Sequence, residues 1–208
     1  SFVLDESSGG ASGISGNASI RFYNCISSFS NLTGDSSQFI LHNSDDMRDV
    51  YIDSCECSHA KTGIQIFTNS GGNPVWNIWI TGYIADQCNR GLYVNNAGDS
   101  QITVEGCYFN ARDRLVEFQH SSGVISNCQF IGTQSCVGVQ LTNARGCIID
   151  NCQFINVDQC IVASQSAACQ ITKNVVQRTT KFKETAAFSF INGSVDNRVF
   201  LNSIIPLA

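Results

Sequence analysis

The stretch Ile148-Ile149-Asp150-Asn151-Cys152-Gln153-Phe154 recurs along the chain with its apolar, turn and cysteine positions kept. Val124-Ile125-Ser126-Asn127-Cys128-Gln129-Phe130 is a near copy, and Thr103-Val104-Glu105-Gly106-Cys107-Tyr108-Phe109 is a third. We take the cysteine as an anchor at position zero. The anchors then stand 21 to 30 residues apart, at Cys25, Cys55, Tyr83, Cys107, Cys128, Cys152, Asn174 and Asn202. Internal repeats of this length predict a solenoid.

The residues before each anchor describe a short strand that ends in a sharp bend. The position three before the anchor is apolar throughout: Phe22, Ile52, Ile80, Val104, Ile125, Ile149, Ile171 and Val199. Apolar residues two apart, as in Ile102-x-Val104, are typical of a strand with one buried face. The position directly before the anchor holds Asn24, Ser54, Gly82, Gly106, Asn127 and Asn151. Because Asn and Gly tolerate a left-handed backbone, we expect the chain to turn there.

A further strand follows each anchor by nine to eleven residues. It is read at Ile64-x-Ile66, Leu92-x-Val94, Val116-x-Phe118, Val137-x-Val139 and Ile161-x-Ala163, and after longer turns at Phe39-x-Leu41 and Phe188-x-Phe190. Three short strands per repeat predict an all-β fold, a right-handed single-stranded parallel β-helix of about eight coils. We expect one domain over residues 1–208, as a fragment or processed part of a longer chain.

Composition excludes several classes of partner. The net charge is −5 and only 14% of the residues are charged, without a basic patch, which argues against nucleic-acid binding. No apolar run approaches the roughly 18 residues of a membrane span, so we predict no membrane insertion.

The eleven cysteines follow the repeat. Ten of them fall on inward positions, and Cys88 alone lies off these ladders. We interpret them as small apolar core residues and favour thiols over disulfides, although the spacing leaves open a bond between stacked neighbours such as Cys136 and Cys160. Cys55-x-Cys57 has no matching second half, so we expect no metal site and no cofactor. Many core thiols favour synthesis in a cytoplasm.

The Ile-x-Asn-Cys-x-Phe repeat, its Asn and Gly bends, and the late anchors Asn174 and Asn202 resemble the pectin-lyase-like superfamily of β-helices. Within it, the cysteine-bearing, charge-poor coils most resemble the shafts of bacteriophage tailspikes. This resemblance implies a homotrimer in a virion tail, assembled in the bacterial cytoplasm, that binds and often cleaves bacterial surface polysaccharide, either capsule or O-antigen. The Gly-His-Gly motif of polygalacturonases and the calcium-binding aspartates of pectate lyases are missing, so neither of those activities is implied.

Outward positions of the third strand form a first candidate site. Glu117 and Asp113 are the predicted catalytic carboxylates, with Asp86 as an alternative second carboxylate, because glycosidic cleavage uses two such groups. Aromatic and amide side chains on adjoining coils are predicted to bind the sugar: Tyr93, Asn95, Gln119 and Gln65. Gly138 is also assigned to this outer face.

The outer face of the first strand is a second candidate. Tyr51 and Trp79 align four before their anchors, and Asp53 and Glu105 align two before theirs. We predict that Tyr51, Trp79 and Glu105 bind substrate. The residues leave three functions open: a polysaccharide depolymerase that acts as hydrolase or lyase, a non-catalytic glycan-binding shaft, or a structural spacer in a trimeric fibre.

Overall fold

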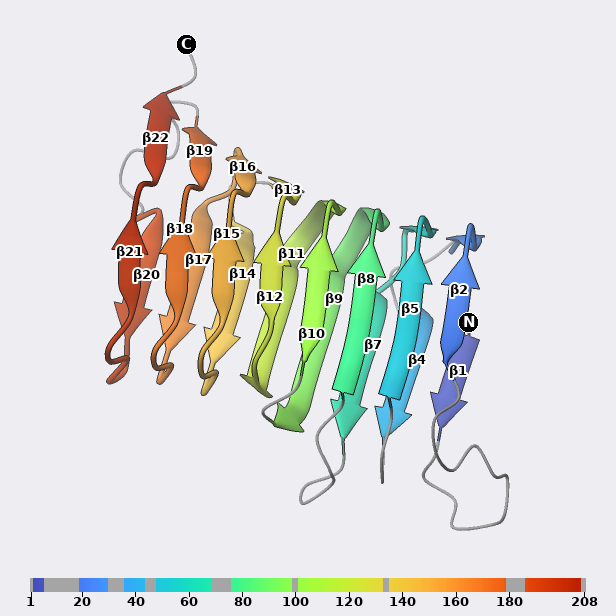
Figure 1. Cartoon of the computed structure of the whole chain (residues 1–208). Coiled ribbons are helices and arrows are strands. Elements are labelled where there is room, and N and C mark those ends of the chain that lie inside the picture. The colour runs from blue at the N-terminus through green and yellow to red at the C-terminus, as the bar shows by residue number, and fades with distance from the viewer. Residues whose placement is uncertain are drawn as a thin grey trace.

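The computed structural model describes residues 2–5, 19–29, 36–43, 48–68, 76–98, 101–132, 135–178 and 186–206. All regular elements among them are β-strands, and none forms a helix long and apolar enough to cross a membrane. The strands stack in parallel as a β-solenoid, which confirms the predicted parallel β-helix (Figure 1). The sense of winding and the number of complete coils stay predictions.

One sheet contains the strand that leads into each anchor, and it forms the near layer of Figure 1. Its order is also the order of the sequence, which is what a solenoid requires. The eight strands are β2 (Ile20–Tyr23), β5 (Arg48–Asp53), β8 (Trp76–Thr81), β10 (Ile102–Glu105), β12 (Val124–Ser126), β15 (Ile148–Asp150), β18 (Gln170–Thr172) and β21 (Arg198–Phe200).

A fourteen-stranded sheet forms the rest of the wall. Strands directly after the anchors are β3 (Ile26–Ser28), β6 (Glu56–Ser58), β13 (Gln129–Ile131), β16 (Gln153–Ile155), β19 (Val175–Arg178) and β22 (Ser203–Pro206). Third strands are β4 (Ser37–Asn43), β7 (Thr62–Thr68), β14 (Val137–Thr142), β17 (Gln159–Ser164) and β20 (Phe188–Ile191), and β1 (Phe2–Asp5) pairs with β4. In two repeats both segments merge, into β9 (Ile84–Gly98) and β11 (Tyr108–Ser121).

The bends before the anchors are confirmed. All six predicted positions have φ between 51° and 62°, in the left-handed region. Lys173 and Leu201, which precede the last two anchors, adopt the same conformation, with φ of 54° and 57°. The bend is therefore imposed by the coil even where the residue type does not favour it.

The core consists of the inward ladders predicted from the repeat. Phe109, Phe130 and Phe154 are fully buried and stack on one another, with ring centroids 5.5 Å and 4.7 Å apart. Ten of the eleven cysteines are buried, and Cys25 is half-buried. Cys88, predicted to lie off the ladders, is buried as well, with its thiol 3.8 Å from the carbonyl oxygen of Cys57.

One predicted third strand was read out of register. Val139 and Leu141 pair with Val116 and Phe118, so the inward positions begin two residues later than Val137. Gly138 is buried and does not lie on the outer face. A Cβ there would lie 2.5 Å from the carbonyl oxygen of Cys160. The cause is a longer turn before β14, and turn lengths carry no periodic signal.

Candidate functional site

The first candidate site lies where β9 and β11 run side by side. Their register places Glu117 opposite Tyr93, Gln119 opposite Asn95, and Arg114 opposite Arg90. Gln65, on β7, is the neighbour of Tyr93 on the other side, and its amide oxygen lies 3.5 Å from the Ser37 hydroxyl. The structure therefore brings together the third-strand residues predicted from the repeat.

Glu117 is enclosed by arginines. Only 5% of the residue is exposed. Nη1 of Arg114 donates to both carboxylate oxygens at 3.0 Å, and Nη1 of Arg90 lies 3.6 Å from Oε2. Arg90 also contacts Asp113, with Nε 3.9 Å from Oδ2. The two predicted catalytic carboxylates thus share one guanidinium, but both oxygens of Glu117 are already engaged.

Tyr93 is also engaged within the protein. Its hydroxyl donates to Oε1 of Gln119 at 3.0 Å, and the Arg90 guanidinium carbon lies 5.1 Å from the ring centroid. Burial, and then the nearby charge of Glu117, raise the pKa of the Tyr93 hydroxyl. A guanidinium over the ring occupies a surface on which a sugar would stack.

Asp86 lies apart from this cluster. It is on the first part of β9, opposite Asn110, and its Oδ1 accepts a hydrogen bond of 2.8 Å from the Asn110 amide. No contact among the described residues joins Asp86 to Glu117. A bulge in the pairing of β9 and β11 follows Asn110, so the residues before and after it belong to different parts of the wall.

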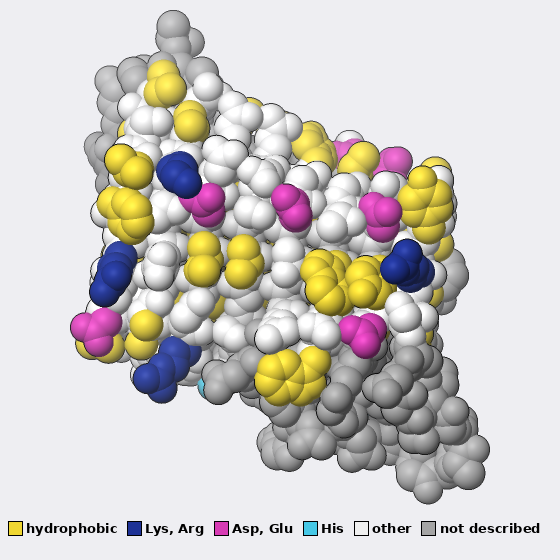
Figure 2. Space-filling view, in the orientation of Figure 1, with side chains coloured by type: hydrophobic (Ala, Val, Ile, Leu, Met, Phe, Trp, Pro, Cys, Tyr) yellow, Lys and Arg dark blue, Asp and Glu magenta, His cyan; other side chains and the backbone are white. Residues whose placement is uncertain are grey.

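The second candidate site is the outer face of the eight-stranded sheet, which Figure 2 shows from outside. The rings of Tyr51 and Trp79 stack with centroids 4.7 Å apart and planes within 4°. The Arg21 guanidinium carbon lies 4.7 Å from the Tyr51 centroid. The same row continues through Thr103, Val124, Ile148, Gln170 and Arg198.

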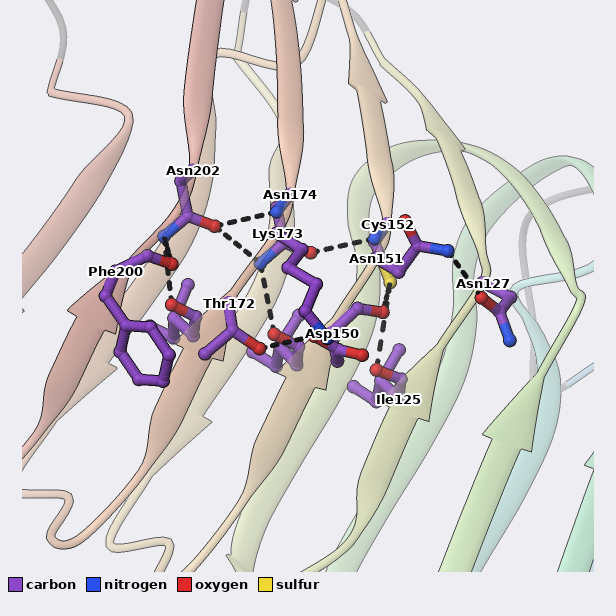
Figure 3. Close-up of polar contacts among 12 residues, drawn as sticks. Ile125, Asn127, Asp150, Asn151, Cys152, Thr172, Lys173, Asn174, Phe200 and Asn202 are labelled. Atoms are coloured by element: carbon purple, nitrogen blue, oxygen red, sulfur yellow. Dashed lines mark hydrogen bonds and ion pairs between the residues drawn. The ribbon is translucent and has the colours of Figure 1, made fainter.

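Carboxylates form the next row of this face. Oδ1 of Asp53 accepts from the Thr81 hydroxyl at 2.9 Å, and Oε1 of Glu105 accepts from the Asn127 amide at 3.1 Å. Asp150 contacts Lys173, with Nζ 3.7 Å from Oδ1, and its carboxylate also accepts from the hydroxyl of the adjacent Thr172 (Figure 3). Thr81 separates Asp53 from Glu105 in the ladder, so the two carboxylates lie two coils apart, about 10 Å.

Sequence reasoning missed the arginines of the first site. Arg90 and Arg114 each stand three residues before an outward residue already selected, Tyr93 and Glu117. That shared offset was the available signal. It also missed His42, whose ring stacks on the ring of Phe67 in the neighbouring coil, with centroids 4.4 Å apart.

The chain matches a family model described as "Periplasmic copper-binding protein (NosD)" over residues 12–206. It belongs to the NosD family. No curated protein and no solved structure matches the chain.

Membership of the NosD family supports the parallel β-helix and corrects one prediction. The predicted location in a virion tail is wrong, because the family is described as periplasmic. The error came from the cysteines, which we read as a sign of cytoplasmic assembly. Burial in stacked ladders gives a reason for cysteine that does not depend on the compartment.

Proposed function

We propose that this NosD-family protein binds polysaccharide along the outer face of its eight-stranded sheet. The supporting observation is the stacked pair of Tyr51 and Trp79 on adjoining coils, whose ring planes are nearly parallel. Tyr51 lies between Arg21 and Trp79, so a sugar would stack on the face of the Trp79 ring that is turned toward Thr103. Sugars present apolar faces that stack on aromatic rings. Because the two rings already pack on each other, binding orders few side chains and loses little conformational entropy.

The surroundings of this pair suit an extended glycan. Its row runs across the strands, so successive sugars would follow the stacking direction of the coils, from Arg21 past the rings toward Val124. The neighbouring row offers Asp53 and Glu105, whose carboxylate oxygens accept hydrogen bonds from sugar hydroxyls. A chain of sugars would therefore find stacking and hydrogen bonding in parallel rows.

The resemblance to tailspike shafts suggests bacterial capsule or O-antigen polysaccharide as the ligand class, and the family description suggests the periplasm as the compartment. That description also names copper. The described residues contain no group of three or more His, Cys, Asp or Glu side chains that could hold a metal ion. The side chains of the described residues therefore do not fit a copper site of three or more such ligands, and the proposed function involves no copper.

Intrinsic fluorescence provides the binding test. The chain has two tryptophans, so Trp76→Phe leaves Trp79 as the reporter. Titration with a panel of bacterial capsule and O-antigen polysaccharides is expected to change this signal for at least one of them. Tyr51→Ala should weaken that polysaccharide's binding at least tenfold, whereas Tyr108→Ala, on the outer face of the other sheet, should leave it unchanged. Equal affinity of both variants would refute the site.

Cleavage of the bound glycan is the second candidate function. The observation in its favour is that Glu117 and Asp113 both contact the guanidinium of Arg90, beside Tyr93. The observation against it is that both carboxylate oxygens of Glu117 already accept hydrogen bonds from Arg114. New reducing ends or unsaturated sugars from any polysaccharide of the panel, abolished by Glu117→Gln or by Asp113→Asn, would establish a depolymerase. Products that persist in both variants would exclude these residues as the catalytic pair.

A further inference from the structure

Two columns of buried thiols run between coils in the C-terminal half of the core. Cys107, Cys128 and Cys152 are anchors of three successive coils and are at most 2% exposed. The strands on both sides of them pair residue by residue, so each cysteine lies directly opposite the next. Cys147 and Cys169 form a second column, directly before the paired residues Ile148 and Gln170.

The spacing of these columns suits a disulfide bond. Neighbouring strands lie about 4.8 Å apart, within the range of about 4.4–6.8 Å that Cα atoms span in disulfides. The Cβ atoms must approach to about 3.8 Å, so each bond draws its two coils slightly together. The thiols also interact with each other: Cys128 with Cys107 and with Cys152, and Cys147 with Cys169. They also lie near backbone carbonyl oxygens, from 3.2 Å between Cys128 Sγ and Ser126 to 3.7 Å between Cys147 Sγ and Ser121.

Cys25 and Cys55, the first two anchors, also lie directly opposite one another, and Cys25 is half-buried. The other four cysteines lack this arrangement. Cys136 and Cys160, whose spacing suggested stacking, are two residues out of register, because Val137 pairs with Gln159 and Val139 with Ile161. Cys57 lies opposite Ala85 rather than opposite Cys88. These offsets separate the four cysteines from those that lie directly opposite one another.

We propose that three disulfide bonds form between neighbouring coils: one joins Cys147 to Cys169, one joins Cys128 to Cys107 or Cys152, and one joins Cys25 to Cys55. The oxidant is the disulfide of a thiol–disulfide exchange protein, which acts while the coils stack and the thiols are still accessible. One cysteine thiolate attacks that disulfide, and the neighbouring thiolate then displaces the carrier. Two thiols become one disulfide, and the carrier leaves as its dithiol.

Each column contains a thiol suited to the nucleophilic step. Hydrogen bonds from the thiols of Cys107 and Cys152 lower the pKa of Cys128, against the opposing effect of burial. A hydrogen bond from Cys147 likewise lowers the pKa of Cys169. Since the thiolate is the attacking species, Cys128 and Cys169 are expected to react first in coils that have stacked far enough to bring the neighbouring thiols beside them.

The proposal depends on the periplasmic location proposed above and not on glycan binding. It is tested on the full chain, made once in a bacterial cytoplasm and once exported to the periplasm. Each sample is denatured in acid, labelled with a maleimide and weighed by mass spectrometry. The cytoplasmic chain should carry eleven labels, one for each cysteine. Three bridges consume six thiols, so the exported chain should carry five.

Two variants locate the bridges. Exported Cys147→Ala has ten cysteines and keeps two bridges, so it should take six labels. The control Cys88→Ala keeps all three bridges and should take four. Peptide mapping without reduction should identify the Cys147–Cys169 peptide pair. Eleven labels on the exported, folded chain, or bridges only between cysteines that are not opposite one another, would overturn the proposal.

Discussion

At the scale of single residues, the column of bends contains two side chains that do not favour a left-handed backbone. Lys173 and Leu201 have φ of 54° and 57°, at the position that holds Asn, Ser or Gly in the other repeats. For most residues this conformation costs about 1–2 kcal/mol relative to the right-handed one, and Asn reduces that cost. Both residues therefore carry strain that the coil geometry imposes.

Leu201→Asn is expected to stabilise the protein. Leu201 is 73% exposed, so the substitution removes strain and little packing. A gain of about 1 kcal/mol should raise the thermal midpoint by roughly 2–4 °C in a chain of this length. The reciprocal control, Asn24→Leu, should lower it by a similar amount. A lower midpoint for Leu201→Asn would show that the bend does not limit stability.

Glu117→Gln is expected to destabilise the fold whether or not the residue is catalytic. The substitution leaves the guanidinium groups of Arg114 and Arg90 without their buried counter-charge, at a cost of about 3 kcal/mol. Denaturant unfolding measures this change. The control Asp113→Asn should change stability by less than about 0.5 kcal/mol, because its side chain is 56% exposed. Equal changes in the free energy of unfolding for the two variants would show that the ion pairs of Glu117 do not stabilise the fold.

At the scale of elements, the anchor position holds Cys or Asn in every repeat except that of Tyr83, and both side chains can donate to the preceding coil. The thiol of Cys128 lies 3.7 Å from the carbonyl oxygen of Val104. The side-chain amide of Asn174 donates to the carbonyl oxygen of Ile149 at 3.0 Å (Figure 3). The oxygen of Asn174 also accepts from the backbone N–H of Cys152 at 2.9 Å. One side chain thus satisfies two buried backbone groups of the preceding coil.

Asn174→Ala should therefore be costly. It leaves the Cys152 N–H and the Ile149 carbonyl without these partners, and Asn174 is fully buried. A loss of about 2–4 kcal/mol follows if each orphaned group costs about 1–2 kcal/mol. Chemical denaturation gives the value. Asn202→Ala, on the last coil and half-buried, should cost less, and the opposite ranking would contradict this account.

At the scale of the whole molecule, the buried thiols make stability depend on alkaline pH. Burial raises the pKa of Cys55 and of Cys160 to about 11, against about 9 for an ordinary thiol. Below pH 9 both states keep these protons. Between about pH 9 and 11 the unfolded chain loses them first, so folding stability falls as the pH rises.

This dependence is measured on the reduced protein by thermal unfolding from pH 8 to 11. The midpoint should fall as the pH rises above about 9. Cys160→Ala removes one titrating group, so its midpoint should fall less steeply than that of the parent chain. Parallel curves for the two proteins would mean that Cys160 does not contribute to the pH dependence.

The homotrimer implied by the tailspike resemblance stays a prediction. Analytical sedimentation would test it, because a trimer has three times the chain mass of 22.6 kDa.

The candidate sites were only partly predictable. The repeat places Tyr51 beside Trp79, and Glu117 beside Tyr93, because residues at equal distance from their anchors stack. It does not predict that Arg90 and Arg114 enclose Glu117, since long side chains reach between rows. It also misplaced Gly138 by two residues, because the insertion lies in a turn.

The sequence by itself determined the parallel β-helix, its anchors and its bends. Each coil needs inward apolar residues and a left-handed turn at the same positions, so these residue types recur at fixed distances from each anchor in the sequence. Only the tertiary structure decided which outer groups are enclosed. Glu117 is enclosed, whereas Tyr51 and Trp79 stack on each other on the outer face of the eight-stranded sheet and stay partly exposed. That outcome depends on side chains from separate coils, whose register is set by turns and bulges rather than by the repeat.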